Sequence, residues 1–167
     1  MKVREIMTSP VDSVRSTESI TRAAEVMAQK DIGVLPVVDS GKLAGIVTDR
    51  DIAVRAVAAG LDNTSPVGDI MTSKVAFCSK DDEIGGVLKT MSNEQVRRMP
   101  VCDGNAVVGM ISLADAARRD PDRTEVAGTL SEICEPSGLH CQSLERSLAT
   151  PRSAVSLGES PGPKVHA

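Results

Sequence analysis

The sequence of this chain repeats itself after 64 positions, and this repeat limits what the chain can fold into. The four residues Ile-Met-Thr-Ser at positions 6–9 return at positions 70–73, and the register then continues without a gap. Four further matched pairs follow it: Pro36 and Pro100, Asp39 and Asp103, Gly45 and Gly109, Asp51 and Asp115. Repeats of this size are supersecondary units that bury their apolar faces on each other. We therefore expect two halves related by a pseudo-twofold axis, with a binding site in the cleft between them.

Composition limits the class of protein. With 167 residues, 41% hydrophobic and 25% charged, the chain can bury a core in one domain or in two paired halves. A net charge of -4 and a single aromatic residue, Phe77, argue against binding to nucleic acid. No apolar run approaches the roughly 20 residues that cross a bilayer, and no signal segment follows Met1. Four cysteines do not make a secreted disulfide framework, so we expect a cytoplasmic protein without a membrane contact.

Each repeat is predicted to contain a helix followed by a β-hairpin. Thr17 and Asp81 are predicted N-caps. Apolar residues at helical spacing follow them: Ile20, Ala23, Ala24 and Met27, then Ile84, Val87, Leu88 and Met91. We expect strands at 34–38 and 43–47 in the first repeat and at 99–102 and 107–111 in the second. Proline cannot donate to a ladder, so the strand with Pro36 is expected at a sheet edge or bulge.

The second strand of each hairpin runs into a helix, which completes a β-α-β-β-α repeat. The helix at 49–59 is expected to end at Gly60. The fold class is therefore α/β (α+β), with two such repeats packed with pseudo-twofold symmetry. We assign residues 1–60 to the first repeat, 61–66 to a linker and 67–122 to the second. A further candidate helix, 123–134, places Val126, Leu130 and Ile133 on one side and is interrupted by Gly128, and 135–167 is predicted to be a flexible tail.

The residues that could bind a ligand lie where each hairpin meets the second helix of its repeat. A glycine, two apolar residues, a hydroxyl residue and, three positions later, a carboxylate occur in both repeats, ending in Thr48 and Asp51 or in Ser112 and Asp115. One interpretation is a variant of the capping box, in which these pairs only cap helices. In the other, the helix N-terminus and the hydroxyl bind a phosphate and the carboxylate binds a sugar diol. Two copies in one register, each after a glycine that lets a ligand approach the backbone, favour the second interpretation.

On these motifs the chain resembles a tandem pair of CBS domains, often called a Bateman module, over about residues 3–120. The resemblance implies that Thr48, Asp51, Ser112 and Asp115 contact an adenosine-containing ligand, with the hydroxyls near phosphate and the carboxylates on the ribose hydroxyls. The segments at 31–36, 48–52 and 95–100 are also similar to small stand-alone bacterial CBS proteins of the hypoxic response type.

The resemblance further implies a set of residues that line the ligand after the Ile-Met-Thr segments and around the Pro-Val pairs. These are Val11, Val34, Pro36, Val75, Arg98 and Pro100. Packing against a sheet explains an apolar side chain at any one of these positions equally well. Gly33-Val34 in the first repeat becomes Arg97-Arg98 in the second. Either Arg98 pairs with a ligand phosphate, or it is a charged residue that protects a strand edge from aggregation.

The sequence contains no motif that favours a catalytic or metal-binding function over this interpretation. The sequence contains no Ser-His-Asp or Cys-His arrangement and no glycine-rich phosphate loop with lysine, so we expect neither an enzyme nor a required cofactor. Cys134, His140 and Cys141 could supply three metal ligands, yet their spacing fits no common zinc pattern, and we assign no metal.

The sequence thus predicts a regulatory module that binds AMP, ATP or another adenosyl ligand between its repeats and signals to a partner protein. The resemblance adds the expectation of a homodimer. The alternative is a ligand-free CBS scaffold or protein-interaction module in a stress response, whose hydroxyl and carboxylate pairs are only helix caps.

Overall fold

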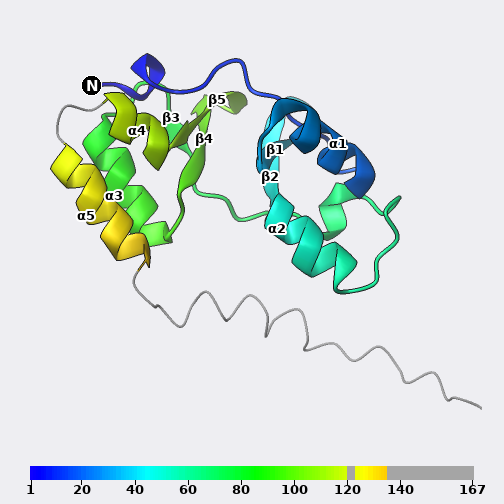
Figure 1. Ribbon diagram of the computed structural model, residues 1–167. Coiled ribbons are helices and arrows are strands. Elements are labelled where there is room, and N and C mark those ends of the chain that lie inside the picture. Colours follow the sequence, from blue (N-terminus) through cyan, green and yellow to red (C-terminus); the bar gives the residue numbers. More distant parts are fainter. Residues whose placement is uncertain (120–122, 135–167) are drawn as a thin grey trace, which may run out of the picture. The chain divides into compact units, whose positions relative to one another are not determined.

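The computed structural model describes residues 1–119 and 123–134 and confirms a mixed α/β fold (Figure 1). The first repeat contains α1 (Ile20–Lys30), β1 (Val34–Asp39), β2 (Lys42–Thr48), α2 (Asp49–Asp51) and a π-helical segment (Ile52–Val57). The second contains β3 (Cys78–Ser79), α3 (Ile84–Glu94), β4 (Arg98–Asp103), β5 (Ala106–Ser112) and α4 (Leu113–Arg119), and α5 (Arg123–Cys134) follows it. The predicted tail, 135–167, lies outside the described residues.

Both hairpins are antiparallel and have the same register, so the repeat in sequence is also a repeat in structure. Each has a register shift one residue after its proline, between Val37 and Val38 in β1 and at the matching place in β4. β3 runs parallel to β4, and Val14 makes the corresponding parallel bridge to β1. The prediction of a bulge near Pro36 is therefore confirmed. β1 forms a two-stranded sheet with β2, and on its other side it makes only an isolated bridge to Val14.

The predicted apolar stripes face the cores, but both predicted N-caps are wrong. α1 begins after Ser19, whose side chain accepts a hydrogen bond from the N–H of Arg22. Thr17 instead lies in the turn that precedes this cap. α3 begins after Glu83, which makes no side-chain cap, while Asp81 forms an ion pair with Arg4. In each case a turn shifts the start of the helix toward its first buried residue.

Two other helices differ in detail from the predictions. The predicted α-helix at 49–59 is α-helical over Asp49–Asp51 and π-helical over Ile52–Val57, so it ends before the predicted Gly60, which follows in a turn with a φ of 68°. α5 continues through Gly128 and packs on α3 and α4. It buries Val126, Thr129 and Ile133, whereas Leu130 is exposed, so the predicted placement of Leu130 on the packed side is wrong.

Each hydrophobic core includes a segment from the start of the other repeat. We call residues 3–8 opening segment 1 and residues 67–72 opening segment 2. Val3 and Ile6 are buried in the core formed by α3, β4 and β5. Val67 and Ile70 are buried in the core formed by α1, β1 and β2. The two repeats are therefore interlocked by exchanged segments.

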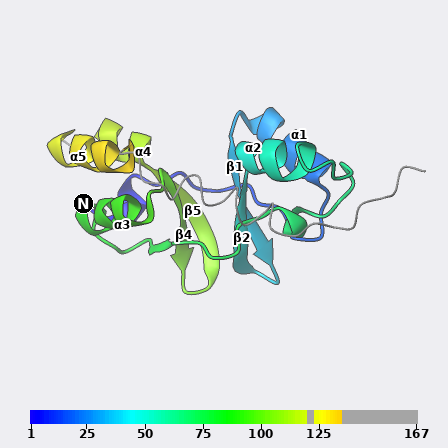
Figure 2. The same ribbon diagram turned by 90° about the horizontal axis from the view of Figure 1, so that it is seen from below.

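Backbone hydrogen bonds hold the exchanged segments in matching positions. Thr8 exchanges a pair of N–H···O bonds with Met110 of β5, at 2.8 and 3.0 Å, and Thr72 exchanges a pair with Ile46 of β2, both at 2.9 Å. These bonds extend each hairpin by one short antiparallel bridge. In Figure 2, β2 and β5 lie next to each other, and their contact is part of the same arrangement.

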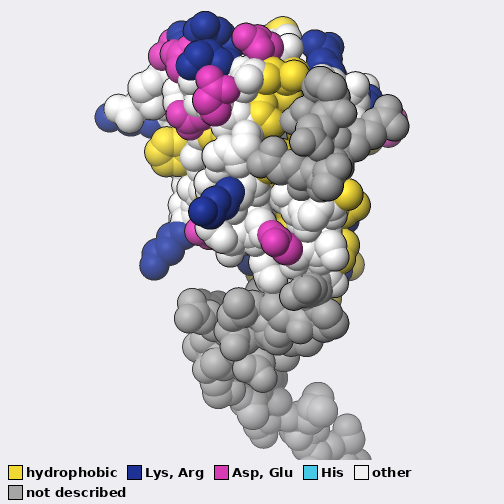
Figure 3. Space-filling model, turned by 90° about the vertical axis from the view of Figure 1, so that its left-hand side faces the viewer, with side chains coloured by type: hydrophobic (Ala, Val, Ile, Leu, Met, Phe, Trp, Pro, Cys, Tyr) yellow, Lys and Arg dark blue, Asp and Glu magenta, His cyan; other side chains and the backbone are white. Residues whose placement is uncertain are grey.

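The N-terminus is also fastened by charge. The Met1 ammonium lies 3.0 Å from a Glu83 carboxylate oxygen, and Arg4 pairs with Asp81. On the face seen in Figure 3, basic and acidic side chains lie next to one another at the upper end. Exposed pairs of this kind stabilise only weakly.

Among the residues the structure describes, none of the helices combines the length and the apolar character that crossing a bilayer requires.

Candidate ligand site

The hydroxyl and carboxylate of the first repeat form a complete capping box. We call Thr48 and Asp51 corner 1. The Asp51 N–H donates to Thr48 Oγ1 at 3.1 Å, and Asp51 Oδ2 accepts from the Thr48 N–H at 2.9 Å and from Thr48 Oγ1 at 2.7 Å. The Asp51 side chain is only 14% exposed. Thr48 ends β2 in an extended conformation, which directs its hydroxyl at the first turn of α2.

Corner 2, Ser112 and Asp115, repeats this geometry at the end of β5. The Asp115 N–H donates to Ser112 Oγ at 3.2 Å, and Asp115 Oδ2 accepts from the Ser112 N–H at 3.0 Å and from Ser112 Oγ at 2.6 Å. The Asp115 side chain is 12% exposed. The capping hydrogen bonds that the first interpretation predicts are thus present in both repeats. Each capping box contains a partly buried carboxylate whose Oδ1 can still accept a hydrogen bond.

The sequence analysis missed two arginines that bind the exchanged segments. Arg55 Nη1 donates to the carbonyl of Ile70 at 2.9 Å and to Thr72 Oγ1 at 3.1 Å. Arg119, 64 positions later, donates from Nη1 to the carbonyl of Glu5 at 3.1 Å. A sequence signal for them exists, because each corner carboxylate is followed four positions later by arginine in both repeats.

The hairpins bring part of the predicted lining set to the corners. Val34 is the cross-strand partner of Thr48, and Arg98 is the partner of Ser112. Directly opposite residues of an antiparallel pair project from the same face. Arg98 and the Ser112 hydroxyl therefore share a face, and the exposed Arg98 makes no ion pair with any described residue.

The remaining predicted residues differ in accessibility. Val11 and Val75 are half-buried and lie after the opening segments. Pro36 and Pro100 are completely buried in the cores. The structure therefore gives Pro36 and Pro100 no surface that a ligand could contact without a rearrangement of the hairpin.

The glycine of each motif has a different role from the one predicted. A Cβ atom at Gly45 would lie 2.7 Å from the Thr72 carbonyl oxygen, and one at Gly109 would lie 2.8 Å from that of Thr8. Methionine side chains of the opening segments fill the rest of this space. The expectation that these glycines admit a ligand is wrong, because the chain's own exchanged segments occupy the space they leave.

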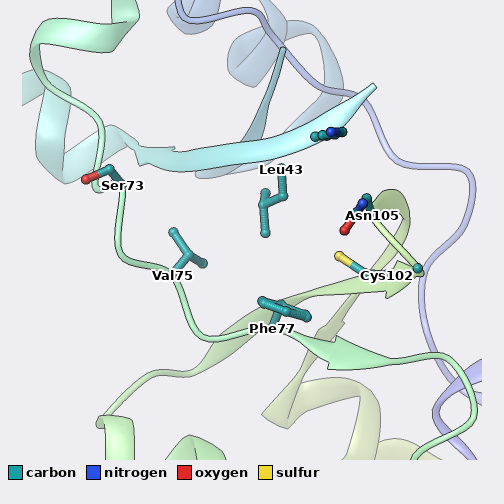
Figure 4. Close-up of a pocket in the computed structure, with 8 residues that line it drawn as sticks. Leu43, Ser73, Val75, Phe77, Cys102 and Asn105 are labelled. Atoms are coloured by element: carbon teal, nitrogen blue, oxygen red, sulfur yellow. The ribbon is translucent and has the colours of Figure 1, made fainter. Parts of the chain in front are cut away.

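A separate cavity of about 260 Å³ lies between the two hairpins, away from both corners (Figure 4). It is lined by Lys42, Leu43, Ser73, Val75, Phe77, Cys102, Gly104 and Asn105. Figure 4 shows Leu43, Val75 and Phe77 around the same space. Phe77, the only aromatic residue of the chain, is 57% exposed there. Of the predicted lining residues, this cavity includes Val75.

Two cysteines near this cavity have little thiolate character. Burial, with smaller contributions from Asp82 and Cys102, raises the pKa of the Cys78 thiol to about 12, and burial raises the pKa of Cys102. The thiolate is the reactive form, so at pH 8 nearly all of Cys78 is the unreactive thiol. We expect iodoacetamide to alkylate both cysteines at least about tenfold more slowly than the exposed Cys134. Peptide mapping by mass spectrometry measures the three rates, and equal rates would show that the cores open readily.

No group of three metal-ligating side chains occurs within residues 1–119 and 123–134. Of the three ligands considered from the sequence, Cys134 is exposed at the end of α5. His140 and Cys141 lie outside the described residues, so the structure does not test that set.

An internally duplicated α/β chain with interlocked halves and two equivalent junction corners is the architecture of a tandem domain pair. The family model for the CBS domain matches residues 3–57 and 67–122. The chain belongs to the CBS domain family.

Its relatives include proteins of similar length. Hypoxic response protein 1 of Mycobacterium tuberculosis is 37% identical over 138 residues, which cover 81% of this chain and 96% of that protein. The CBS domain-containing protein YhcV of Bacillus subtilis is 34% identical over 131 residues, covering 78% of this chain and 94% of that protein.

A solved CBS domain pair, that of protein MJ0100 in complex with 5′-methylthioadenosine and S-adenosyl-L-methionine, has a TM-score of 0.64 and 34% identity. The match covers 71% of this chain and 94% of that one.

Proposed function

We propose that this protein is a non-enzymatic regulatory module that binds an adenosine-containing ligand between its CBS repeats and signals to a partner protein. The observation that carries the proposal is the MJ0100 pair, 34% identical, which was solved with two adenosyl compounds. This chain has a partly buried carboxylate beside a hydroxyl in both repeats, which suits a ribose diol next to a polar substituent. We place the protein in the cytoplasm as a homodimer, by analogy with the family.

In this proposal the corner residues contact the ribose and its substituent, and Val11, Val34, Val75 and Arg98 border the ligand. Pro36 and Pro100 support the hairpins from inside the cores. Ligand binding can shift the module between conformations only if the two conformations differ in affinity for the ligand.

The test is titration of the purified protein with 5′-methylthioadenosine, S-adenosylmethionine, AMP, ATP and NAD, monitored by thermal denaturation and calorimetry. A ligand selective for the folded state raises its stability by about 2.7 kcal/mol at a hundredfold excess over Kd. We expect saturable stabilisation by at least one compound and its loss in the double variant Asp51→Asn, Asp115→Asn. Asparagine retains one acceptor oxygen for the cap but loses the charge.

The control is Glu25→Gln, which removes one of the same kind of charge from the exposed surface of α1. This variant should bind as the unchanged protein does. Stabilisation that survives in the double corner variant would place the ligand elsewhere, and the cavity at Phe77 is then the next site to test.

A second candidate function has its own supporting observation. Both capping boxes are complete without a ligand, and no buried side-chain nitrogen or oxygen of the described residues lacks a hydrogen-bond partner. A CBS pair used only as a scaffold or protein-interaction module needs nothing more. Absence of any thermal shift across the five compounds at millimolar concentration would favour this alternative.

Arg98 separates phosphorylated from uncharged ligands in the proposal. We expect Arg98→Ala to weaken AMP binding about tenfold, the scale of one charge-assisted hydrogen bond, and to leave 5′-methylthioadenosine binding within about twofold. Calorimetry of both ligands on one variant measures this. Unchanged AMP affinity would leave Arg98 as a charged residue that protects the strand edge.

A further inference from the structure

One guanidinium in the first repeat contacts both corner 1 and opening segment 2. Arg55 Nε lies 3.3 Å from Asp51 Oδ1, while Nη1 of the same side chain holds the Ile70 carbonyl and the Thr72 hydroxyl. The side chain is about one-third exposed, so these charge-assisted contacts are only partly screened by solvent. Arg55 therefore joins the carboxylate of one repeat directly to the exchanged segment that starts the other.

The second repeat divides the same two contacts between two residues. Asp115 Oδ1 pairs with Arg118, which is 73% exposed. Arg119, the equivalent of Arg55, holds the Glu5 carbonyl of opening segment 1. Within the described residues, corner 2 thus contacts one arginine and the exchanged segment contacts another.

The hydrogen-bond capacity of Asp51 shows what a diol would displace. Oδ2 already accepts two bonds from Thr48, and Oδ1 accepts one contact from Arg55. A carboxylate offers about four acceptor positions, and a ribose diol brings two O–H donors. A diol that donates both of its O–H groups to Asp51 therefore needs the acceptor position on Oδ1 that Arg55 occupies. The 3.3 Å contact to Arg55 is the longest of the three contacts to this carboxylate.

We propose that Arg55 is a positioning residue that makes corner 1 the sensing corner of the module. A diol on Asp51 releases Arg55 from the carboxylate and loosens its hold on opening segment 2. A diol on Asp115 releases only Arg118, which bonds to neither opening segment. The part of this inference that concerns ligand binding rests on the proposed function. The contacts of Arg55 do not depend on it, because they are present without ligand.

The link is tested in the unliganded protein by amide hydrogen exchange, resolved by NMR. Asp51→Asn retains an acceptor oxygen for Thr48 and turns an NH₂ group toward Arg55, so it breaks the link while preserving the cap. We expect the Thr72 amide, bonded to the Ile46 carbonyl at 2.9 Å, to exchange about tenfold faster in this variant.

The matched control is Asp115→Asn, the same change in corner 2. Here the Thr8 amide, bonded to the Met110 carbonyl at 2.8 Å, should keep its exchange rate within about twofold. An equal response of Thr8 and Thr72 to the two variants, or no response of Thr72, would overturn the asymmetry between the corners.

Ligand binding provides the second arm, with 5′-methylthioadenosine as the probe because it has a ribose diol and no phosphate. Saturating probe should accelerate exchange at Thr72 in the unchanged protein and cause no acceleration in Arg55→Met or Arg55→Lys. Acceleration that persists in both Arg55 variants would contradict the proposal. If calorimetry detects no binding of any adenosyl compound, the proposed function fails, and the exchange comparison of Asp51→Asn with Asp115→Asn still decides the role of Arg55.

Discussion

Gly45→Ala is expected to destabilise the protein by at least about 2 kcal/mol, although it adds only one methyl group. The new Cβ would lie 2.7 Å from the Thr72 carbonyl oxygen and 2.8 Å from the Met71 sulfur. The carbonyl belongs to backbone that is itself paired with Ile46, so it cannot move without breaking those bonds. Urea denaturation at constant m-value measures the loss.

Gly86→Ala is the matched control for this substitution. Gly86 lies in α3, and a Cβ there meets no atom within 4 Å. Alanine should therefore stabilise the protein by roughly 0.5–1 kcal/mol through helix propensity. Gly109→Ala should resemble Gly45→Ala, because its Cβ would lie 2.8 Å from the Thr8 carbonyl oxygen. If Gly45→Ala is neutral, opening segment 2 does not pack against β2 in solution.

Ile70→Ala is expected to cost about 3 kcal/mol, within the range for buried isoleucine, and to weaken the first repeat more than the second. Ile70 is 1% exposed and lies in the core formed by α1, β1 and β2, although it belongs in sequence to the start of the second repeat. Amide exchange should accelerate more in β1 and β2 than in β4 and β5.

Val57→Ala provides the comparison for Ile70→Ala. Val57 is a large aliphatic side chain of the first repeat that is 73% exposed, so its truncation should change stability by less than about 0.5 kcal/mol. A response of β4 and β5 ahead of β1 and β2 in Ile70→Ala would show that opening segment 2 packs within its own repeat.

The elements of the fold were largely predictable because they depend on short-range patterns. The stripe from Ile84 to Met91 has helical spacing, and all four of its predicted residues are buried. The errors came where two nearby residues could fill the same structural role. Thr17 is a good cap by residue type, but Ser19 is nearer to the first buried turn. Leu130 fits a helical stripe, yet Thr129 is on the buried side of α5.

The hydroxyl and carboxylate pairs of the candidate site were predictable from the sequence, but the arginine contacts that join corner 1 to the other repeat were not. The spacing of Thr48 and Asp51 is a capping-box variant, and the structure confirms the hydrogen bonds that this spacing allows. Arg55 was missed because its importance depends on Ile70 and Thr72, which the sequence analysis placed in the other repeat. Whether a ligand uses the corners stays a prediction until the titrations are done.

Periodicity and duplication establish the helices, the hairpins and the equivalence of the two halves, because these depend on residues a few positions apart and on a register that can be read directly. The exchange of opening segments could not be read in this way. Both segments end in the same residues, Ile-Met-Thr, so either could pack on either hairpin. Only the fit of the assembled cores decides between these pairings. It places Val3 with Met99 and Ile70 with Leu35, and it fills the space beside Gly45 and Gly109 with the exchanged backbone.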